Sequence, residues 1–308
     1  MRKKKVYISG QEGMVGSSIL RLLKEKNFKI INCKRNQLDL LDQKKVYNWL
    51  LKNKPDIVIH TAGRVGGILH NSSYPANFIF ENAQMALNVI HGSYKAGVKK
   101  IINLGSACIY PKFSKQPIRE EYLLTGKLEE TNEAYAIAKI LGLKMTEFYN
   151  KQYRTNYISL QPTNLYGEND NFDVKSSHVI PALINKFHKA KILKKNKVEI
   201  WGTGMPKREF LYVDDLAEAI LFILKKNINF DLINIGSGEE VTIKKLANLI
   251  KKVVNFKGKI KFDKNKPDGT PRKLVSNKIL KSKGWKPKTK LFAGLNKTYN
   301  FYKKYDNK

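Results

Sequence analysis

The chain has 308 residues, long enough for a large domain with a smaller one appended, and it contains no apolar run that could span a bilayer. Its formal net charge of +32 comes from lysines scattered along the whole sequence, not from a basic motif with interleaved aromatic residues; this argues against specific nucleic-acid binding and favours an anionic substrate or cofactor. Two cysteines, Cys33 and Cys108, do not make a disulfide framework, and residues 1–5 lack the apolar core of a signal peptide, so we expect a cytoplasmic protein.

Strands are predicted to alternate with helices through the first half of the chain. The predicted strands lie at residues 5–9, 29–33, 57–60, 100–105 and 157–161. The helices between them are expected at residues 14–23, 43–53, 77–96 and 135–152. This order is typical of an α/β fold, and we predict a Rossmann-like, doubly wound parallel sheet covered by helices on both faces.

Beyond about Gly167 the pattern changes to shorter segments separated by loops. Strands are expected at 198–201 and 231–235, helices at 213–224 and 242–253, and a solvated helix end and loop in the lysine-rich segment 189–197. We therefore predict a dinucleotide-binding domain at residues 1–167, to which later strands return. Residues 168–308 are expected to form mainly a smaller α/β lobe that binds the substrate.

A glycine-rich turn follows the first strand directly and contains Gly10, Gly13 and Gly16. In this position the glycines allow a dinucleotide pyrophosphate to approach the backbone at the start of a helix. The second strand ends in Cys33-Lys34-Arg35, with no acid to bind the ribose hydroxyl of NAD, so the residues favour NADP. Two cations could also be incidental in so lysine-rich a chain, and Glu12 lies in the loop, where it could repel the 2′-phosphate.

Two segments about thirty residues apart carry the chemistry, at residues 105–110 and 135–139. Tyr135 and Lys139 lie four residues apart on one helix face, so the ammonium can sit beside the phenol and lower its pKa. A phenol placed in this way can give a proton to a carbonyl oxygen while a hydride arrives at the carbon. Cys108, two residues after Ser106, indicates a second reaction, although a cysteine at a strand end can also be a buried filler.

The full set of motifs resembles the extended short-chain dehydrogenase/reductases, and within them the enzymes that make GDP-L-fucose from GDP-4-keto-6-deoxy-D-mannose. The resemblance runs nearly end to end, through residues 10–16, 64–68, 105–111, 131–139, 162–167, 177–182, 201–204, 208–210 and 266–273. The pair Tyr135 and Lys139 marks only the superfamily. The pair Cys108 and His178, together with the motif at residues 266–273, narrows the resemblance to the enzymes that make GDP-L-fucose.

This resemblance implies a bifunctional, NADPH-dependent 3,5-epimerase and 4-reductase. It assigns proton donation at the C4 oxygen to Tyr135, binding of the same oxygen to Ser106, and binding of the nicotinamide ribose to Lys139. The C4 ketone acidifies the protons at C3 and C5, and the resemblance makes Cys108 the base and His178 the acid for their inversion. Cysteine and histidine are suitable residue types for this task near neutral pH.

The resemblance also implies how ligands and partners are bound. The cofactor, NADP(H), is assigned to Gly10, Gly13, Met14, Val15, Gly16, Arg35, Asp39, Ala62, Leu104, Gly105, Lys139, Pro162, Thr163, Asn164, Leu165 and His178. The GDP-sugar substrate is assigned to Lys186, Trp201, Arg208, Asp268 and Lys273. Lys186 stands where the family often has arginine, and Glu12 where an arginine is expected. A homodimer formed through the helices at 77–96 and 134–152 is implied, and no metal or membrane is expected.

Two alternatives remain open at this point. One is a related GDP-sugar C4-reductase or epimerase that acts on a different keto-hexose or heptose with part of this chemistry; the presence of both Cys108 and His178 argues against it. The other is a non-catalytic nucleotide-binding protein, which the complete set of Ser106, Tyr135 and Lys139 disfavours. The sequence leaves open the order of the two epimerisations.

Overall fold

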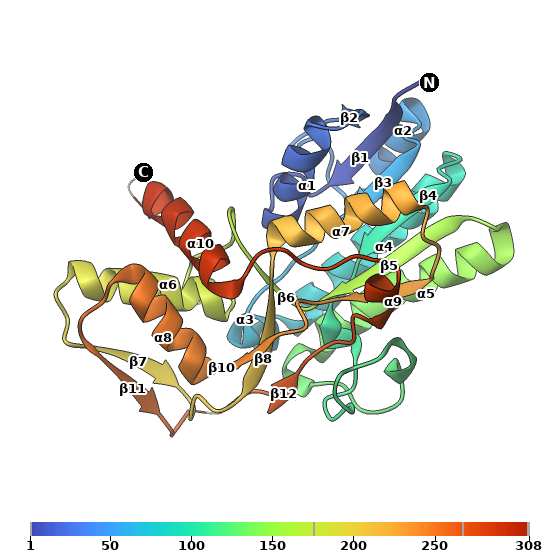
Figure 1. The fold of residues 1–308 in the computed structure, drawn as a ribbon. Coiled ribbons are helices and arrows are strands. Elements are labelled where there is room, and N and C mark those ends of the chain that lie inside the picture. The colour runs from blue at the N-terminus through green and yellow to red at the C-terminus, as the bar shows by residue number, and fades with distance from the viewer. Residues whose placement is uncertain (1, 175, 267, 307–308) are drawn as a thin grey trace.

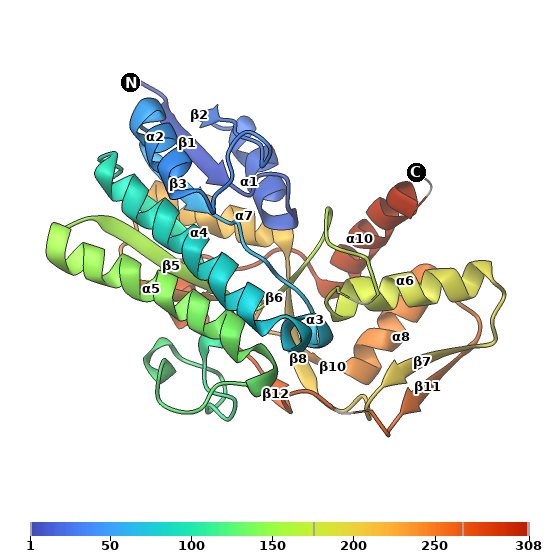
Figure 2. The same ribbon diagram turned by 180° about the vertical axis from the view of Figure 1, so that it is seen from behind.

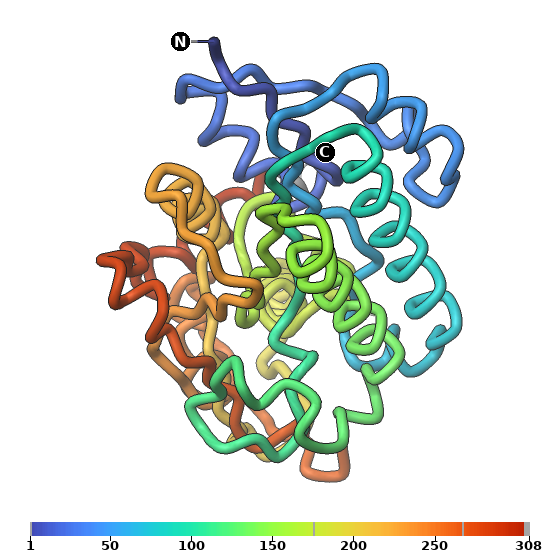
Figure 3. Tube along the Cα trace, turned by 90° about the vertical axis from the view of Figure 1, so that its right-hand side faces the viewer, coloured from blue at the N-terminus to red at the C-terminus, as the bar shows by residue number. Residues whose placement is uncertain are grey.

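The computed structural model describes residues 2–174, 176–266 and 268–306, so Pro267 of the 266–273 motif lies outside the described residues. A large lobe surrounds the main sheet, and a smaller lobe lies beside it (Figures 1 and 2). The Cα trace shows the later segments returning alongside the N-terminal lobe (Figure 3). In the described ranges no helix is both long enough and apolar enough to cross a membrane.

The main sheet has six strands in the order β2-β1-β3-β4-β5-β9, and all of them are parallel. Their bounds are β1 Lys4–Ser9, β2 Phe28–Ile31, β3 Ile57–His60, β4 Lys100–Leu104, β5 Asn156–Pro162 and β9 Leu232–Ile235. The predicted Rossmann-like parallel sheet is confirmed, and β9 is a strand that returns from the second half. The strand order reverses at β1 and β3, and sheets of this kind bind ligands at the carboxyl ends of the strands near that point.

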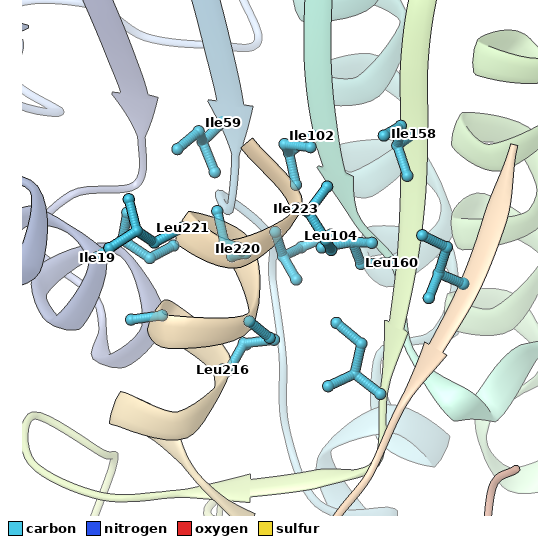
Figure 4. Packing of buried hydrophobic residues seen from close by; sticks show 14 of the residues in the cluster. Ile19, Ile59, Ile102, Leu104, Ile158, Leu160, Leu216, Ile220, Leu221 and Ile223 are labelled. Atoms are coloured by element: carbon cyan, nitrogen blue, oxygen red, sulfur yellow. The ribbon is translucent and has the colours of Figure 1, made fainter. Parts of the chain in front are cut away.

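Helices cover both faces of this sheet because its strands bury apolar side chains on both sides. One face carries α1 (Met14–Lys24) and α7 (Val213–Lys226), and Figure 4 shows α7 side chains such as Leu216 and Ile220 packed against Ile102 and Leu160 of the strands. The opposite face carries α2 Gln43–Asn53, α4 Pro75–Lys95 and α5 Glu133–Tyr153. Successive strand residues alternate between the two cores, as the period of two requires.

The smaller lobe has its own apolar core, which contains Phe187, Phe210 and Ile250. Its helices are α6 Val179–Ile192, α8 Ile243–Val254 and α10 Leu291–Asp306. Its strands are β6 Asn164–Tyr166, β7 Lys197–Trp201, β8 Lys207–Tyr212, β10 Glu240–Thr242, β11 Lys259–Asp263 and β12 Arg272–Lys273. Strands β6, β10 and β12 all pair with β8, and β7 pairs with β11.

Several short elements were not predicted from the sequence: α3 Ile68–Ser73, α9 Lys278–Ser282 and the 3₁₀ helices Ala107–Ile109, Glu120–Tyr122 and Glu130–Asn132. They have too few residues to give a periodic apolar pattern. The second strand is also shorter than predicted, because it ends at Ile31 and not at Cys33. The three residues Cys33-Lys34-Arg35 therefore lie in the loop beyond the sheet.

Candidate active site

The glycine-rich turn has the geometry expected of an anion-binding loop. Gly10 has φ +76°, and a Cβ there would lie 2.8 Å from the Cα of Ala62. A Cβ at Gly16 would overlap the carbonyl oxygen of Gly10. Gly13 precedes α1 without a side-chain cap, so the N–H groups of the first helical turn stay available. These features fit a pyrophosphate bound at the helix N-terminus.

An open hollow of about 560 Å³ lies beside this turn, and its lining residues are Glu12, Lys34, Arg35, Asn36, Asp39 and Leu41. Glu12 faces Arg35, whose backbone N–H donates to the Glu12 carboxylate at 3.4 Å. The carboxylate of Asp39 accepts the backbone N–H of Leu41 at 3.0 Å. The two cations make the hollow suitable for a phosphate group, and Glu12 opposes them.

Ser106 lies directly beyond the carboxyl end of β4 and is held by a buried glutamine. Its backbone N–H donates to the side-chain oxygen of Gln161 at 2.7 Å, and Gln161 is completely buried. A Cβ at Gly105 would overlap that same amide, which explains the glycine. The Ser106 hydroxyl accepts the backbone N–H of Cys108 at 3.2 Å. Sequence reasoning gave Gln161 no role, because nothing local links β5 to the turn after β4.

Tyr135 and Lys139 share one face of α5, as predicted. The ammonium of Lys139 lies 5.7 Å from the Tyr135 ring centroid and donates to the carbonyl oxygen of Leu104 at 2.9 Å. Both residues keep some exposed surface, but the protein around them lowers the pKa of Lys139 to about 8 through burial.

The pKa of Tyr135 is raised above its usual value, chiefly by burial and then by negative charge on Cys108, while a hydrogen bond with Ser106 acts in the opposite direction. The predicted net lowering of the Tyr135 pKa is therefore wrong for this structure. Loss of hydration outweighs any effect of the ammonium, whose hydrogen bond goes to Leu104.

Cys108 is half-buried in the 3₁₀ turn that follows Ser106. The side-chain amide of Asn132, at the start of α5, donates to its sulfur at 3.8 Å. Cys108 therefore lies between Ser106 and Asn132, at the N-terminus of α5, and it does not act as a core filler. Asn132 belongs to one of the motifs quoted above, but sequence reasoning assigned it no role.

His178 immediately precedes α6, and the segment before it is docked onto the loop that leads to α3. The backbone N–H of Gly67 donates to the carbonyl of Ser176 at 2.9 Å, and a Cβ at Gly67 would lie 2.6 Å from the Ser177 oxygen. Asn71 donates to the carbonyl oxygens of residues 66 and 67 and fixes that loop. His178 retains exposed surface, yet the surrounding protein lowers its pKa through burial. Sequence reasoning missed both Gly67 and Asn71.

Arg208 lies on β8 of the smaller lobe. Burial lowers its pKa, and the negative charges of Asp268, Cys108 and Glu129 act in the opposite direction. Lys273 pairs with Arg208 across β12 and β8.

The Asp268 carboxylate accepts the backbone N–H of Thr203 at 3.0 Å and its hydroxyl at 2.6 Å. It therefore holds the turn at residues 202–204 in place, close to Arg208.

Trp201 and Lys186 lie on β7 and α6 of the smaller lobe. Trp201 is 46% exposed, so it is not a core residue. The ammonium groups of Lys186 and Lys266 lie 5.9 and 5.6 Å from its ring centroid. An exposed aromatic ring flanked by two cations is suited to a planar, anionic ligand such as a nucleotide.

The other predicted cofactor residues collect at the carboxyl ends of the strands of the main sheet. Ala62 and Leu104 follow or end β3 and β4, and Pro162 ends β5. Thr163 continues the chain with an N–H bond to Ile235, and Asn164 donates to the backbone of Glu209 at 2.9 Å. The described ranges contain no group of three or more acidic, histidine or cysteine residues able to hold a metal ion.

The buried carboxylate of Glu209 holds the strand that carries Arg208. It accepts the backbone N–H groups of Gly238 at 2.6 Å and Val275 at 3.0 Å, and it is completely buried. Burial raises its pKa against these hydrogen bonds. Glu209 thereby fixes β8 against the segments on both sides, which explains why an acid stands between Arg208 and Phe210.

Comparison with known proteins gives consistent matches over the whole chain. Residues 6–236 match the model of the NAD dependent epimerase/dehydratase family. The GDP-L-fucose synthase of Sinorhizobium fredii is 53% identical over 97% of this chain and 95% of its own length.

Among solved structures, a GDP-6-OMe-4-keto-L-xylo-heptose reductase from C. jejuni has a TM-score of 0.94 at 36% identity, covering 99% of both chains. A GDP-L-fucose synthetase from Naegleria fowleri bound to NADP has a TM-score of 0.90 at 29% identity, covering 100% of this chain and 96% of that one. These matches extend through both lobes.

Proposed function

The chain belongs to the NAD dependent epimerase/dehydratase family, and on that premise we propose that it is a bifunctional, NADPH-dependent 3,5-epimerase and 4-reductase that converts GDP-4-keto-6-deoxy-D-mannose to GDP-L-fucose. One observation carries the proposal. The thiol of Cys108 lies beside Ser106 and the helix that carries Tyr135: the backbone N–H of Cys108 donates to the Ser106 hydroxyl, and its sulfur accepts the amide of Asn132 at the start of α5. A reductase alone needs no such thiol.

The epimerisations begin with Cys108 as a thiolate. It removes the proton from a carbon next to the C4 ketone; the C–H bond breaks, an S–H bond forms, and the electron pair moves onto the C4 oxygen as an enolate. The hydroxyl groups of Ser106 and Tyr135 can donate to that oxygen and stabilise its charge. His178 then returns a proton to the opposite face of the carbon, which inverts it.

The reduction uses Ser106, beyond the end of β4, together with Tyr135 and Lys139 on α5. When bound, the nicotinamide cofactor supplies the hydride that reaches C4. Tyr135 gives its proton to the C4 oxygen, and its raised pKa keeps the phenol protonated at neutral pH until then. The ammonium of Lys139, beside the ring, stabilises the phenolate as it forms. Ser106 holds the oxygen in place throughout.

The cofactor in this proposal is NADP(H), with Arg35 as the principal contact of the 2′-phosphate. The hollow lined by Lys34 and Arg35, without an acid at the end of β2, supports this choice. The NADP bound to the Naegleria fowleri structure supports it further. Glu12 weakens the preference by placing a carboxylate in the same hollow.

We assign the GDP part of the substrate to the smaller lobe. Lys186, Arg208 and Lys273 provide cations for the pyrophosphate, and Trp201 offers an exposed ring on which the base or sugar can pack. Asp268 contributes by holding the neighbouring turn at residues 202–204. In this assignment the sugar end of the ligand extends from Arg208 toward the Cys108 thiol.

We also propose that the protein is a homodimer that pairs through α4 and α5. These helices expose large apolar side chains on the side away from the sheet, among them Phe80 (61% exposed) on α4 and Phe148 (56% exposed) on α5. A patch of this kind on two neighbouring helices suits a two-fold helical interface. A reducing compartment, the cytoplasm, would keep the Cys108 thiol active.

The decisive experiment incubates the protein with GDP-4-keto-6-deoxy-D-mannose and NADPH in heavy water and identifies the product by NMR. We expect GDP-L-fucose with deuterium at C3 and C5. The Cys108→Ser variant should lose this deuterium, whereas normal exchange would refute its role as base. NADPH consumption without deuterium in the product would favour the alternative, a C4-reductase of another keto-sugar, to which the similarity with the C. jejuni heptose reductase points.

A further inference from the structure

Asn132 makes an unusual use of its side chain. It is the last residue before α5, a position where asparagine commonly caps the helix by accepting a backbone N–H. Here its side chain makes no capping hydrogen bond. Its amide N–H donates instead to the sulfur of Cys108 at 3.8 Å. Its side-chain oxygen is buried and has no hydrogen-bond partner within the described residues.

Both of these features cost stability, so they point to a use other than folding. A missing cap leaves helix N–H groups unsatisfied, and a buried acceptor without a partner retains its desolvation penalty. Buried polar atoms that lack partners are uncommon in native proteins and often mark sites of function. Within the described residues, the one hydrogen bond of the Asn132 side chain goes to the thiol that the proposed reaction uses as its base.

Helical spacing places Asn132 in line with Tyr135 and Lys139. Asn132, Tyr135 and Lys139 follow one another at spacings of three and four residues, which puts them along one face of α5. Asn132, which contacts the Cys108 thiol, therefore lies just before the first turn of this face, and Tyr135 and Lys139 lie on the turns that follow. The N-terminal end of the helix also favours negative charge near Asn132.

We propose that Asn132 is the positioning residue of the epimerase half-reaction, and that it serves both protonation states of Cys108; this rests on the proposed function. Its amide N–H donates to the thiolate before proton transfer. When the substrate C–H bond breaks and the S–H bond forms, the amide can turn so that its free oxygen accepts the S–H. This accounts for the side-chain oxygen of Asn132, which is buried and has no hydrogen-bond partner within the described residues.

The test compares Asn132→Leu, which keeps the size but removes the donor, with Asn132→Asp, which keeps the shape and adds a negative charge. Alkylation of Cys108 by iodoacetamide at about pH 7 is followed by mass spectrometry. Cys33, 7% exposed, is the internal reference for loosening of the fold, and Asn248→Leu on α8 is the matched control. We expect alkylation to slow about tenfold or more in the leucine variant and further in the aspartate variant.

Equal alkylation rates for Cys108 in all three proteins would overturn the proposal, as would faster alkylation in the variants, the result expected if Asn132 only shields the thiol. Deuterium incorporation from heavy water into GDP-4-keto-6-deoxy-D-mannose is the second readout, and it should fall in parallel while NADPH binding is unchanged. If the wild-type protein incorporates none, the proposed function fails, while the alkylation series still decides whether Asn132 stabilises the Cys108 thiolate. Normal incorporation in the variants refutes that role alone.

Discussion

The charge on Lys139 should set the alkaline limit of the reduction. Burial lowers the pKa of this ammonium to about 8, whereas the pKa of Tyr135 is raised, so the phenol stays protonated well above the pH at which Lys139 loses its proton. Below about pH 8 the ammonium is charged and can stabilise the developing phenolate. Each further pH unit lowers the charged fraction about tenfold, so at about pH 9 roughly one tenth of the molecules keep it.

The assay measures kcat/KM for NADPH from about pH 6 to about pH 9.5, since this parameter reports the free enzyme. NADPH deuterated at the transferred position shows where hydride transfer limits the rate. We expect the logarithm of kcat/KM to be constant up to about pH 8 and to fall above it by about one unit per pH unit. The Lys139→Met variant should have a low kcat/KM without this break. A flat profile across pH 8 would refute this role of Lys139.

Three further changes test other parts of the site. Tyr135→Phe should nearly abolish NADPH oxidation while cofactor binding persists; unchanged turnover would contradict the proton-donor assignment. Glu12→Arg should raise the ratio of NADPH to NADH affinity by about tenfold in fluorescence titrations, and a constant ratio would mean that position 12 does not face the phosphate. Gly67→Ala should displace the segment before His178, destabilise the protein to urea by about 1–3 kcal/mol and slow deuterium exchange; Gly126→Ala, with more room for a Cβ, is its control.

The main sheet could be predicted because its strands are short apolar runs that alternate with segments long enough to form helices. Residues 57–60 are buried on both faces, as are most residues of β4 and β5, and such runs between helices leave few arrangements other than a parallel sheet. The small sheet around β8 could not be predicted in the same way. Strands of two or three residues, such as β12, exist only because distant segments pair with β8.

In the candidate site, too, features set by local spacing could be predicted, and contacts between distant segments could not. The relation between Tyr135 and Lys139 follows from helical spacing alone, and the loop at Gly10 follows from its place after a strand. Contacts between distant segments had no local signal: Gln161 on Ser106 is one example, and Gly67 on the segment before His178 is another. Spacing also fixes which face a residue occupies but not how deeply it is buried. That is why the direction of the Tyr135 pKa shift was predicted wrongly.

The coupling between Cys108 and Tyr135 bears on the order of the two reactions. Inversion requires the C4 ketone, because only the ketone acidifies C3 and C5, so early reduction would trap an uninverted product. Negative charge on Cys108 raises the pKa of Tyr135 and makes the phenol a weaker acid. While Cys108 is a thiolate, Tyr135 therefore donates its proton less readily, and reduction is slowed until the epimerisation has begun. Cys108→Ser removes this charge, so we expect it to reduce the uninverted ketone, which NMR of the product would reveal; a failure to consume NADPH would contradict the argument.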